Sequence, residues 1–212
     1  MTATKRFIQA WQQGFVCLHP TDTIPGLSFN PRSNEGLQRF CDIKGRRPDK
    51  TTICLLASVE LAKTYWLALP AGWQRALSKG WPAGLSLIWY ASSRVPESLV
   101  RDDGTIAFRV PQFSDHDRWM SDVLTELQIP FPTSSVNQSG EPSAECWSDA
   151  VKKLDGLAGI YIPNDQTNSE SVSNKAVAST LIRICEDDQG SGYQIIREGS
   201  FDERNLKTWL MS

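Results

Sequence analysis

The sequence predicts a single domain of the α/β class. Its 212 residues are enough for one domain with a substantial core. Short apolar runs typical of buried strands alternate along the chain with segments whose apolar residues recur at helical spacing. No internal repeat and no linker of biased composition divides the chain. We therefore expect residues 1–212 to form one α/β domain.

Spacing and breaker residues set the elements of the first half. Apolar residues at helical spacing predict a helix over 4–13, and the apolar run 15–18 predicts the first strand. Pro20 cannot donate a ladder hydrogen bond, so the chain must leave the sheet there. Gly45 is expected to end a helix in the left-handed conformation. The other elements expected in this half are helices at 35–44, 59–67 and 71–79 and strands at 27–29, 52–56 and 85–90.

A polar connection at 96–104 leads into the second half, in which alternation and helical spacing again predict the elements. In the strand predicted at 105–111, alternation places Arg109 on the face opposite Ile106 and Phe108. If that face is covered, the charge of Arg109 needs a bound anion or an acidic partner. The hydroxyl-rich run 133–140 predicts a turn. The remaining expectations are helices at 114–128, 148–154 and 202–210, strands at 159–162, 179–184 and 193–199, an acidic hairpin at 186–190 and a polar loop at 164–174.

Composition narrows the function classes. Lys and Arg number 22 against 24 Asp and Glu, so the surface as a whole is not suited to nucleic acid and any anion site must be local. No apolar run approaches the roughly 20 residues that a membrane span needs. The five cysteines are scattered without a Cys-x-x-Cys pair, which favours reduced thiols and no structural zinc. We expect a cytoplasmic protein.

Two polar segments are candidates for a binding site. Thr21, Asp22 and Thr23 follow the first strand, at the edge where open α/β sheets bind ligands, although a capped turn uses the same residue types. Gly26 leaves room for a ligand near the backbone. The segment 44–50 holds four cations in seven residues, which is typical either of a solvated surface or of a phosphate or carboxylate site.

These segments belong to a longer series of motifs. In chain order they are Pro20-Thr21-Asp22-Thr23-x-x-Gly26-Leu27, Lys44-Gly45-Arg46, Arg109-Val110-Pro111, Ser135-Val136-Asn137-Gln138-Ser139-Gly140, Ser179-Thr180 and Arg197-Glu198-Gly199. The series resembles the YrdC-type threonylcarbamoyl-AMP synthase family in its compact, single-domain form, over nearly the whole chain. The resemblance implies a twisted mixed β-sheet flanked by helices, with a concave and locally positive ligand cavity. Pro25 stands where the family often has an aromatic residue.

The resemblance also implies a reaction and its participants. L-threonine, bicarbonate and ATP would give threonylcarbamoyl-AMP and pyrophosphate, for modification of the adenosine next to the anticodon in certain tRNAs. Mg²⁺ is expected with ATP, and tRNA is expected as a partner directly or through a downstream transferase complex. The implied catalytic residues are Lys44 and Arg46; those for threonine are Thr23, Arg109, Ser135 and Ser179; those for the nucleotide are Lys44, Arg46, Lys50, Thr105, Asn137 and Arg197.

Two other functions stay open at this point. A divergent YrdC-like paralogue would keep the cavity with a different or lost activity, and the change at Pro25 is the feature that favours it. A double-stranded RNA or tRNA-binding module would use the concave surface without catalysis. The formal net charge of −2 argues against the second alternative, because RNA affinity depends on many phosphate contacts.

Overall fold

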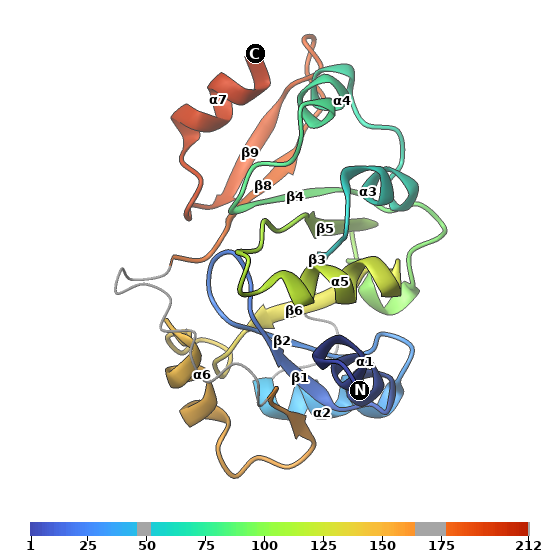
Figure 1. The fold of residues 1–212 in the computed structure, drawn as a ribbon. Coiled ribbons are helices and arrows are strands. Elements are labelled where there is room, and N and C mark those ends of the chain that lie inside the picture. Colours follow the sequence, from blue (N-terminus) through green and yellow to red (C-terminus); the bar gives the residue numbers. More distant parts are fainter. Residues whose placement is uncertain (46–51, 164–176, 212) are drawn as a thin grey trace.

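The computed structural model describes residues 1–45, 52–163 and 177–211, in which helices and strands alternate as expected (Figure 1). The helices are α1 (Ala3–Gln12), α2 (Asn34–Lys44), α3 (Val59–Tyr65), α4 (Ala71–Ser78), α5 (Arg118–Leu127), α6 (Trp147–Leu154) and α7 (Glu203–Met211), with a 3-10 helix η1 (Glu97–Leu99). The strands are β1 (Val16–His19), β2 (Gly26–Ser28), β3 (Ile53–Leu55), β4 (Leu85–Tyr90), β5 (Thr105–Arg109), β6 (Phe131–Ser135), β7 (Ile160–Tyr161), β8 (Thr180–Ile184) and β9 (Tyr193–Arg197).

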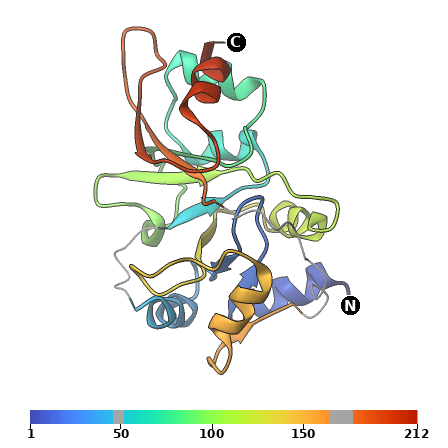
Figure 2. The ribbon, with the colours of Figure 1, turned by 90° about the vertical axis from the view of Figure 1, so that its left-hand side faces the viewer.

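All nine of these strands form one mixed sheet, in the order β7-β1-β2-β6-β3-β5-β4-β8-β9. The pairs β1–β7, β3–β5 and β4–β8 are parallel, and the other neighbours are antiparallel. Figures 1 and 2 show the early strands β1 and β2 toward one end of the molecule and the late strands β8 and β9 at the other. The predicted α/β fold with a mixed sheet and outer helices is confirmed.

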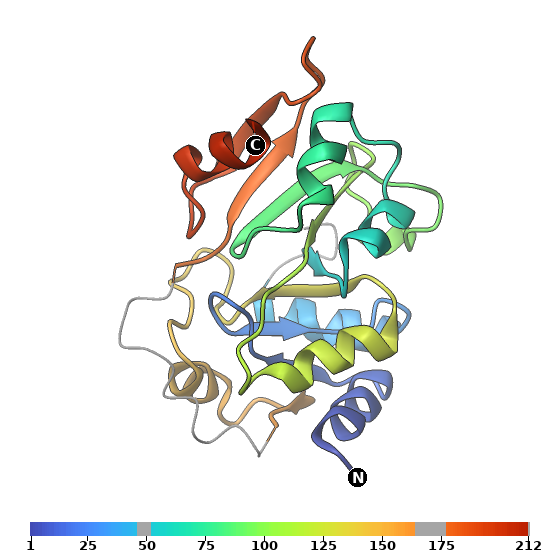
Figure 3. The same ribbon diagram turned by 45° about the horizontal axis from the view of Figure 1, so that its top comes forward.

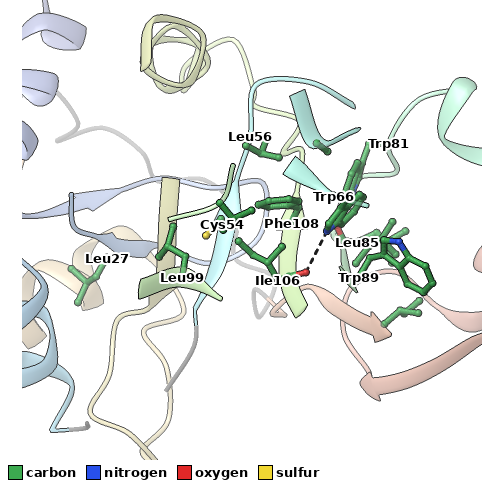
Figure 4. Packing of buried hydrophobic residues seen from close by; sticks show 14 of the residues in the cluster. Leu27, Cys54, Leu56, Trp66, Trp81, Leu85, Trp89, Leu99, Ile106 and Phe108 are labelled. Atoms are coloured by element: carbon green, nitrogen blue, oxygen red, sulfur yellow. Dashed lines mark hydrogen bonds between the residues drawn. The ribbon is translucent and has the colours of Figure 1, made fainter. Parts of the chain in front are cut away.

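The larger hydrophobic core contains aromatic residues of β4 and β5 together with Trp66 and Trp81 (Figure 4). The indole rings of Trp66 and Trp81 stack with their centroids 5.8 Å apart, and the Trp66 Nε1–H donates to the Ile106 carbonyl at 3.4 Å. Ile106 and Phe108 are both fully buried in this core, on the face that alternation predicted. Arg109 consequently points to the opposite face of β5, as expected.

A smaller core lies where α1 packs against α5, which Figure 3 shows side by side. Phe7 and Trp11 of α1 are buried there with Met120 of α5 and with Phe131. The Trp11 ring stacks on Phe131 at 5.4 Å between centroids, and its Nε1–H donates to Ser28 Oγ at 3.0 Å. The predicted amphipathic helix therefore has a packing role, and its one buried donor is satisfied.

The structure corrects the prediction of a turn beginning at residue 133. Phe131–Ser135 is the strand β6, which lies between β2 and β3 near the middle of the sheet. Pro132 argued against a central strand, because it offers no N–H. It pairs with Cys54 of β3 only, and pairing with β2 begins at Thr133, so the proline takes part in one ladder of the two.

Two smaller corrections concern helices. The helix expected from residue 114 begins at Arg118, because Ser114 is used in a turn in which its hydroxyl donates to Asp117 at 3.0 Å. The polar connection 96–104 contains η1.

Among the residues that the structure describes, none of the helices has the length and apolar character that a membrane span requires. The loop at 164–174 and the predicted site residues Arg46 and Lys50 lie outside the described residues.

Candidate functional site

A cavity of about 260 Å³ opens where several strand ends and their loops meet. Its lining combines hydroxyl groups with three guanidinium groups. The hydroxyl residues are Thr21, Thr23, Thr52, Thr133, Ser134, Ser135, Ser143 and Ser179, and the arginines are Arg101, Arg109 and Arg197. Hydroxyls and guanidiniums in a concave site are suited to a polar ligand that carries negative charge.

Arg109 is the most buried of the three arginines, and its acidic partner is Asp22. Its Nη2 forms an ion pair with Asp22 Oδ1, and its Nη1 donates to Thr23 Oγ1 at 2.8 Å. Burial lowers the pKa of Arg109, and the neighbouring Asp22 carboxylate opposes that shift. The Arg109 Nε–H is buried without a hydrogen-bond partner. The motif after β1 therefore orients a guanidinium whose Nε–H donor is unused.

Asp22 also ties the motif to the far side of the sheet. Its Oδ2 accepts a hydrogen bond from the backbone N–H of Gly84 at 3.2 Å. Gly84 has a positive φ of 70°, and a Cβ there would lie 2.2 Å from Ser200 Oγ, so only glycine fits. The Gly84 carbonyl in turn accepts from Thr180 N at 2.9 Å, which connects this turn to β8. The carboxylate of Asp22 thus has partners in two separate segments.

The hydroxyl groups of the first motif have a fixed direction. Thr21 Oγ1 donates to the Ile24 carbonyl at 2.8 Å, so its only proton is used. The contact of 3.1 Å between Thr21 Oγ1 and Thr23 Oγ1 must then be a donation from Thr23. Since Thr23 also accepts from Arg109, its hydroxyl proton is directed at Thr21 and its oxygen is oriented by the guanidinium. The capped turn therefore forms part of the cavity wall.

Ser179 and Arg197 come together at the other wall of the cavity. Arg197 Nε and Nη2 donate to the Ser179 carbonyl at 3.1 and 2.8 Å, and Ser179 Oγ lies 2.9 Å from Ser86 Oγ. Gly199 permits this close packing, because a Cβ there would lie 2.3 Å from the Ala178 carbonyl oxygen. Burial lowers the pKa of Arg197. Among the described residues its hydrogen bonds all go to Ser179, and no carboxylate forms an ion pair with it.

Lys44, Ser135 and Asn137 form a third group next to the cavity. The Lys44 ammonium donates to the Ser135 carbonyl at 2.6 Å and to Asn137 Oδ1 at 2.8 Å, and the Ser135 hydroxyl donates to the same Oδ1 at 2.6 Å. Lys44 is the last residue of α2, and Gly45 follows in the left-handed conformation, as predicted. Ser135 lines the cavity, whereas Lys44 is only 2% exposed and lies behind it.

Thr105 is separated from the other predicted nucleotide residues. Its hydroxyl donates to Asp103 Oδ1 at 2.6 Å, and it lines a second hollow together with Arg183. It is not among the residues that line the cavity. The placement gives no support to a direct role for Thr105 in nucleotide binding.

Several lining residues were missed by the sequence interpretation. Thr133 and Ser134 lie in the hydroxyl-rich run, but only Ser135 was assigned a role from it. Arg101 lies in a connection with no motif, and no pattern in the sequence marks it. Within the described part of the chain, no group of three or more His, Cys, Asp or Glu side chains could hold a metal ion. The cavity itself therefore offers no carboxylate cage for Mg²⁺.

His19 orients one of these missed hydroxyls from beneath the cavity. The ring is fully buried, with Nδ1 3.0 Å from the Pro20 carbonyl and Nε2 2.8 Å from Thr133 Oγ1. A carbonyl can only accept, so Nδ1 carries the proton and Nε2 accepts the proton of Thr133. Burial lowers the pKa of His19 to about 4, and Arg109 adds to this shift. The neutral imidazole leaves Thr133 an acceptor toward the cavity.

Replacing His19 by Phe is expected to flatten the dependence of stability on pH. In the unfolded chain a histidine binds its proton near pH 6.5, whereas the buried ring of His19 binds one only near pH 4. Between these values the unfolded state holds more protons, so acidification favours unfolding, by about 3 kcal/mol at pH 4. Urea titrations of wild type and variant from pH 7 to pH 4 measure this difference.

The matched control is His116→Gln, which changes the other histidine, an exposed one. Phe at position 19 keeps the ring packing against Phe131, whose centroid is 5.2 Å away. Its absolute stability will fall, because Thr133 and Pro20 lose their partner. Parallel pH profiles for wild type and His19→Phe would contradict a neutral buried His19.

The fold and the cavity together define a class of protein: an α/β protein whose mixed sheet carries a cationic, hydroxyl-lined cavity. The family model Sua5/YciO/YrdC, described as telomere recombination, matches residues 9–199. The chain belongs to the Sua5/YciO/YrdC family.

Relatives and solved structures agree with this membership. The chain is 31% identical over 153 residues to the threonylcarbamoyl-AMP synthase of Halorhodospira halophila. The aligned residues make up 71% of this chain and 75% of that protein. It is 24% identical over 149 residues to the one from Hydrogenovibrio crunogenus, with 69% and 78% covered. E. coli YciO superimposes with a TM-score of 0.75 at 18% identity, over 96% of this chain and 91% of that one. Pyrococcus abyssi Sua5 gives a TM-score of 0.76 at 24% identity. The superposition covers 99% of this chain but only 58% of the Sua5 chain.

Proposed function

We propose that this protein is a threonylcarbamoyl-AMP synthase, which forms threonylcarbamoyl-AMP and pyrophosphate from L-threonine, bicarbonate and ATP. The observation that carries the proposal is the cavity, in which three arginines face hydroxyl groups and Asp22 pairs with only one of them. The family and the names of the relatives support it. The superimposed Pyrococcus abyssi Sua5 was solved in complex with L-threonine.

Threonine binding is assigned to the wall formed by Thr23, Arg109 and Ser179. Arg109 is held in place by Asp22 and Thr23, so little side-chain entropy is lost when it binds an anion. Its unpartnered Nε–H suits the threonine carboxylate. Thr133 accepts hydrogen bonds, because its proton is used by His19, and therefore suits the amine of threonine. Ser135 and Ser179 add hydroxyls on either side.

The nucleotide is assigned to the remaining cations, Lys44 and Arg197, with Asn137 and with Arg46 and Lys50 from the segment outside the described residues. In the proposed step a carbamate oxygen of carboxylated threonine forms a bond to the α-phosphorus of ATP. The bond from that phosphorus to the bridging oxygen breaks, and its electron pair leaves with pyrophosphate. Positioned cations stabilise the charge that develops on the phosphoryl oxygens, and no protein nucleophile is needed.

Mg²⁺, tRNA and the cytoplasmic location belong to the proposal as well. Mg²⁺ commonly retains several waters and is bound largely through substrate phosphates, so it would enter with ATP rather than in a protein cage. The product is proposed to serve tRNA modification, either directly or through a transferase complex. The five cysteines are free in the structure, which is compatible with a reducing cytoplasm.

Release of pyrophosphate by the purified protein tests the proposed function. With ATP, bicarbonate and Mg²⁺, release is expected to require L-threonine and to fall at least about tenfold with alanine, because alanine lacks the side chain that the cavity hydroxyls bind. Omitting bicarbonate is the second control. A protein that binds ATP by calorimetry but releases no pyrophosphate would be a divergent paralogue, and one that does neither but binds RNA would be the RNA-binding module.

A further inference from the structure

Arg101 is a cation of the cavity that no motif of the family resemblance includes. It follows η1 and is fixed to the start of β5 by two backbone hydrogen bonds. Arg101 N donates to the Thr105 carbonyl at 2.8 Å, and Gly104 N donates to the Arg101 carbonyl at 2.8 Å. This short closed loop anchors the backbone at Arg101 while its side chain lines the cavity.

Strand register places Arg101 at the same end of the cavity as Lys44. β3 runs parallel to β5, with Ile53 opposite Ala107, and antiparallel to β6, with Ile53 opposite Thr133. The beginning of β3 therefore lies between the beginning of β5, where Arg101 is anchored, and the end of β6, where Lys44 binds Ser135.

Arg109 lies at the opposite end of the same strands. It is four residues after Thr105 along β5, which corresponds to about 13 Å at the rise of an extended strand. The backbones of Arg101 and Arg109 are therefore attached at opposite ends of β5, and both side chains line the cavity. Arg109 is paired with Asp22, whereas no ion pair to Arg101 is found among the described residues.

The charge of Arg101 is offset only in part by its surroundings. Its Nε is buried and has no hydrogen-bond partner. The Asp103 carboxylate acts on Arg101 through its charge, but the hydrogen bonds of its two oxygens come from Thr105 and Arg183 and not from Arg101. Burial lowers the pKa of Arg101, which shows that its charged form has lost part of its hydration. A partly desolvated guanidinium facing a cavity favours a bound anion.

We propose that Arg101 binds the pyrophosphate portion of the nucleotide, at the end of the cavity next to the beginnings of β3 and β5. This assignment rests on the proposed synthase function for the identity of the ligand. The leaving pyrophosphate gains charge as the bond to the α-phosphorus breaks, so a cation at this end stabilises both the bound ATP tail and the departing group. Arg101 is then a determinant for triphosphate over monophosphate nucleotides.

Calorimetry with inorganic pyrophosphate and with AMP tests the site without requiring turnover. Arg101→Gln is expected to weaken pyrophosphate binding about 10- to 100-fold, the loss typical of a charge-assisted hydrogen bond, and to leave AMP affinity within about twofold. Arg94→Gln is the matched control, because Arg94 is an exposed arginine in the same connection between β4 and β5. Arg101→Lys, which keeps the charge, is expected to retain part of the affinity. Thermal unfolding of each variant verifies the fold.

The outcomes separate this inference from the proposed function. Unchanged pyrophosphate affinity in Arg101→Gln, an equal loss for AMP, or a folded wild type that binds no pyrophosphate would overturn the role of Arg101. Loss of pyrophosphate binding in the variant, together with a wild type that forms no product from threonine, would overturn the synthase function and leave the anion site standing.

Discussion

Arg109→Ala is expected to lower the free energy of unfolding by about 3–5 kcal/mol and to weaken threonine binding far more than ATP binding. The stability loss arises because Asp22, whose side chain is 6% exposed, would be left as a buried charge without its guanidinium. The binding loss arises because Arg109 is the cation at the end of the cavity assigned to threonine. Urea unfolding and calorimetry with each substrate measure the two effects.

A double-mutant cycle with Asp22→Ala separates the pair from its surroundings. If the ion pair is the main cost, the double variant will be much less destabilised than the sum of the single variants. Thr21→Ser is a conservative control in the same turn, since it retains the hydroxyl that donates to Ile24. Equal losses of threonine and ATP affinity in Arg109→Ala would contradict the assignment of this end of the cavity to threonine.

Lys44→Ala is expected to reduce pyrophosphate release about 100-fold or more. The ammonium orders Ser135 and Asn137, and it is the described cation of the basic segment assigned to the phosphates. Stability should fall by only about 1–3 kcal/mol, because the Ser135 carbonyl loses the Lys44 donor while Asn137 Oδ1 keeps the Ser135 hydroxyl. Steady-state kinetics at saturating threonine, with thermal unfolding as a check on folding, provides the measurement.

Lys63→Ala serves as the comparison, because Lys63 is an exposed lysine in the last turn of α3, as Lys44 is in the last turn of α2. Its turnover should equal that of the wild type. A Lys44→Ala variant with normal turnover would remove Lys44 from the catalytic site and leave it as a buried structural lysine.

Much of the fold was predictable, because breaker residues and apolar spacing determine where helices and strands begin and end. The apolar run before Pro20 and the left-handed Gly45 each end an element where the structure ends it. β6 was missed because its residues are polar and it contains Pro132. Such a strand is stable through its neighbours, which lie about 80 and 105 residues earlier in the chain.

The site was predictable only in part, because sheet order brings distant segments together. The motifs identified Arg109 and Thr23, and the structure joins them directly. The pairing of Asp22 with Gly84, and the position of Arg101 in the wall of the cavity, depend on the order and register of strands, which no local pattern encodes. His19 was read as the end of a strand, and its effect on Thr133 appears only when β6 is next to β2.

The contact between Asp22 and the Gly84 amide has a consequence for local motion. An amide hydrogen held by a carboxylate exchanges with solvent only when that bond opens, so exchange at Gly84 follows the opening of the Asp22 turn. The same residue is bonded to β8 through its carbonyl. Binding of an anion at Arg109 is therefore expected to keep the Asp22 turn closed and to slow hydrogen exchange at the Gly84 amide, which lies between that turn and β8.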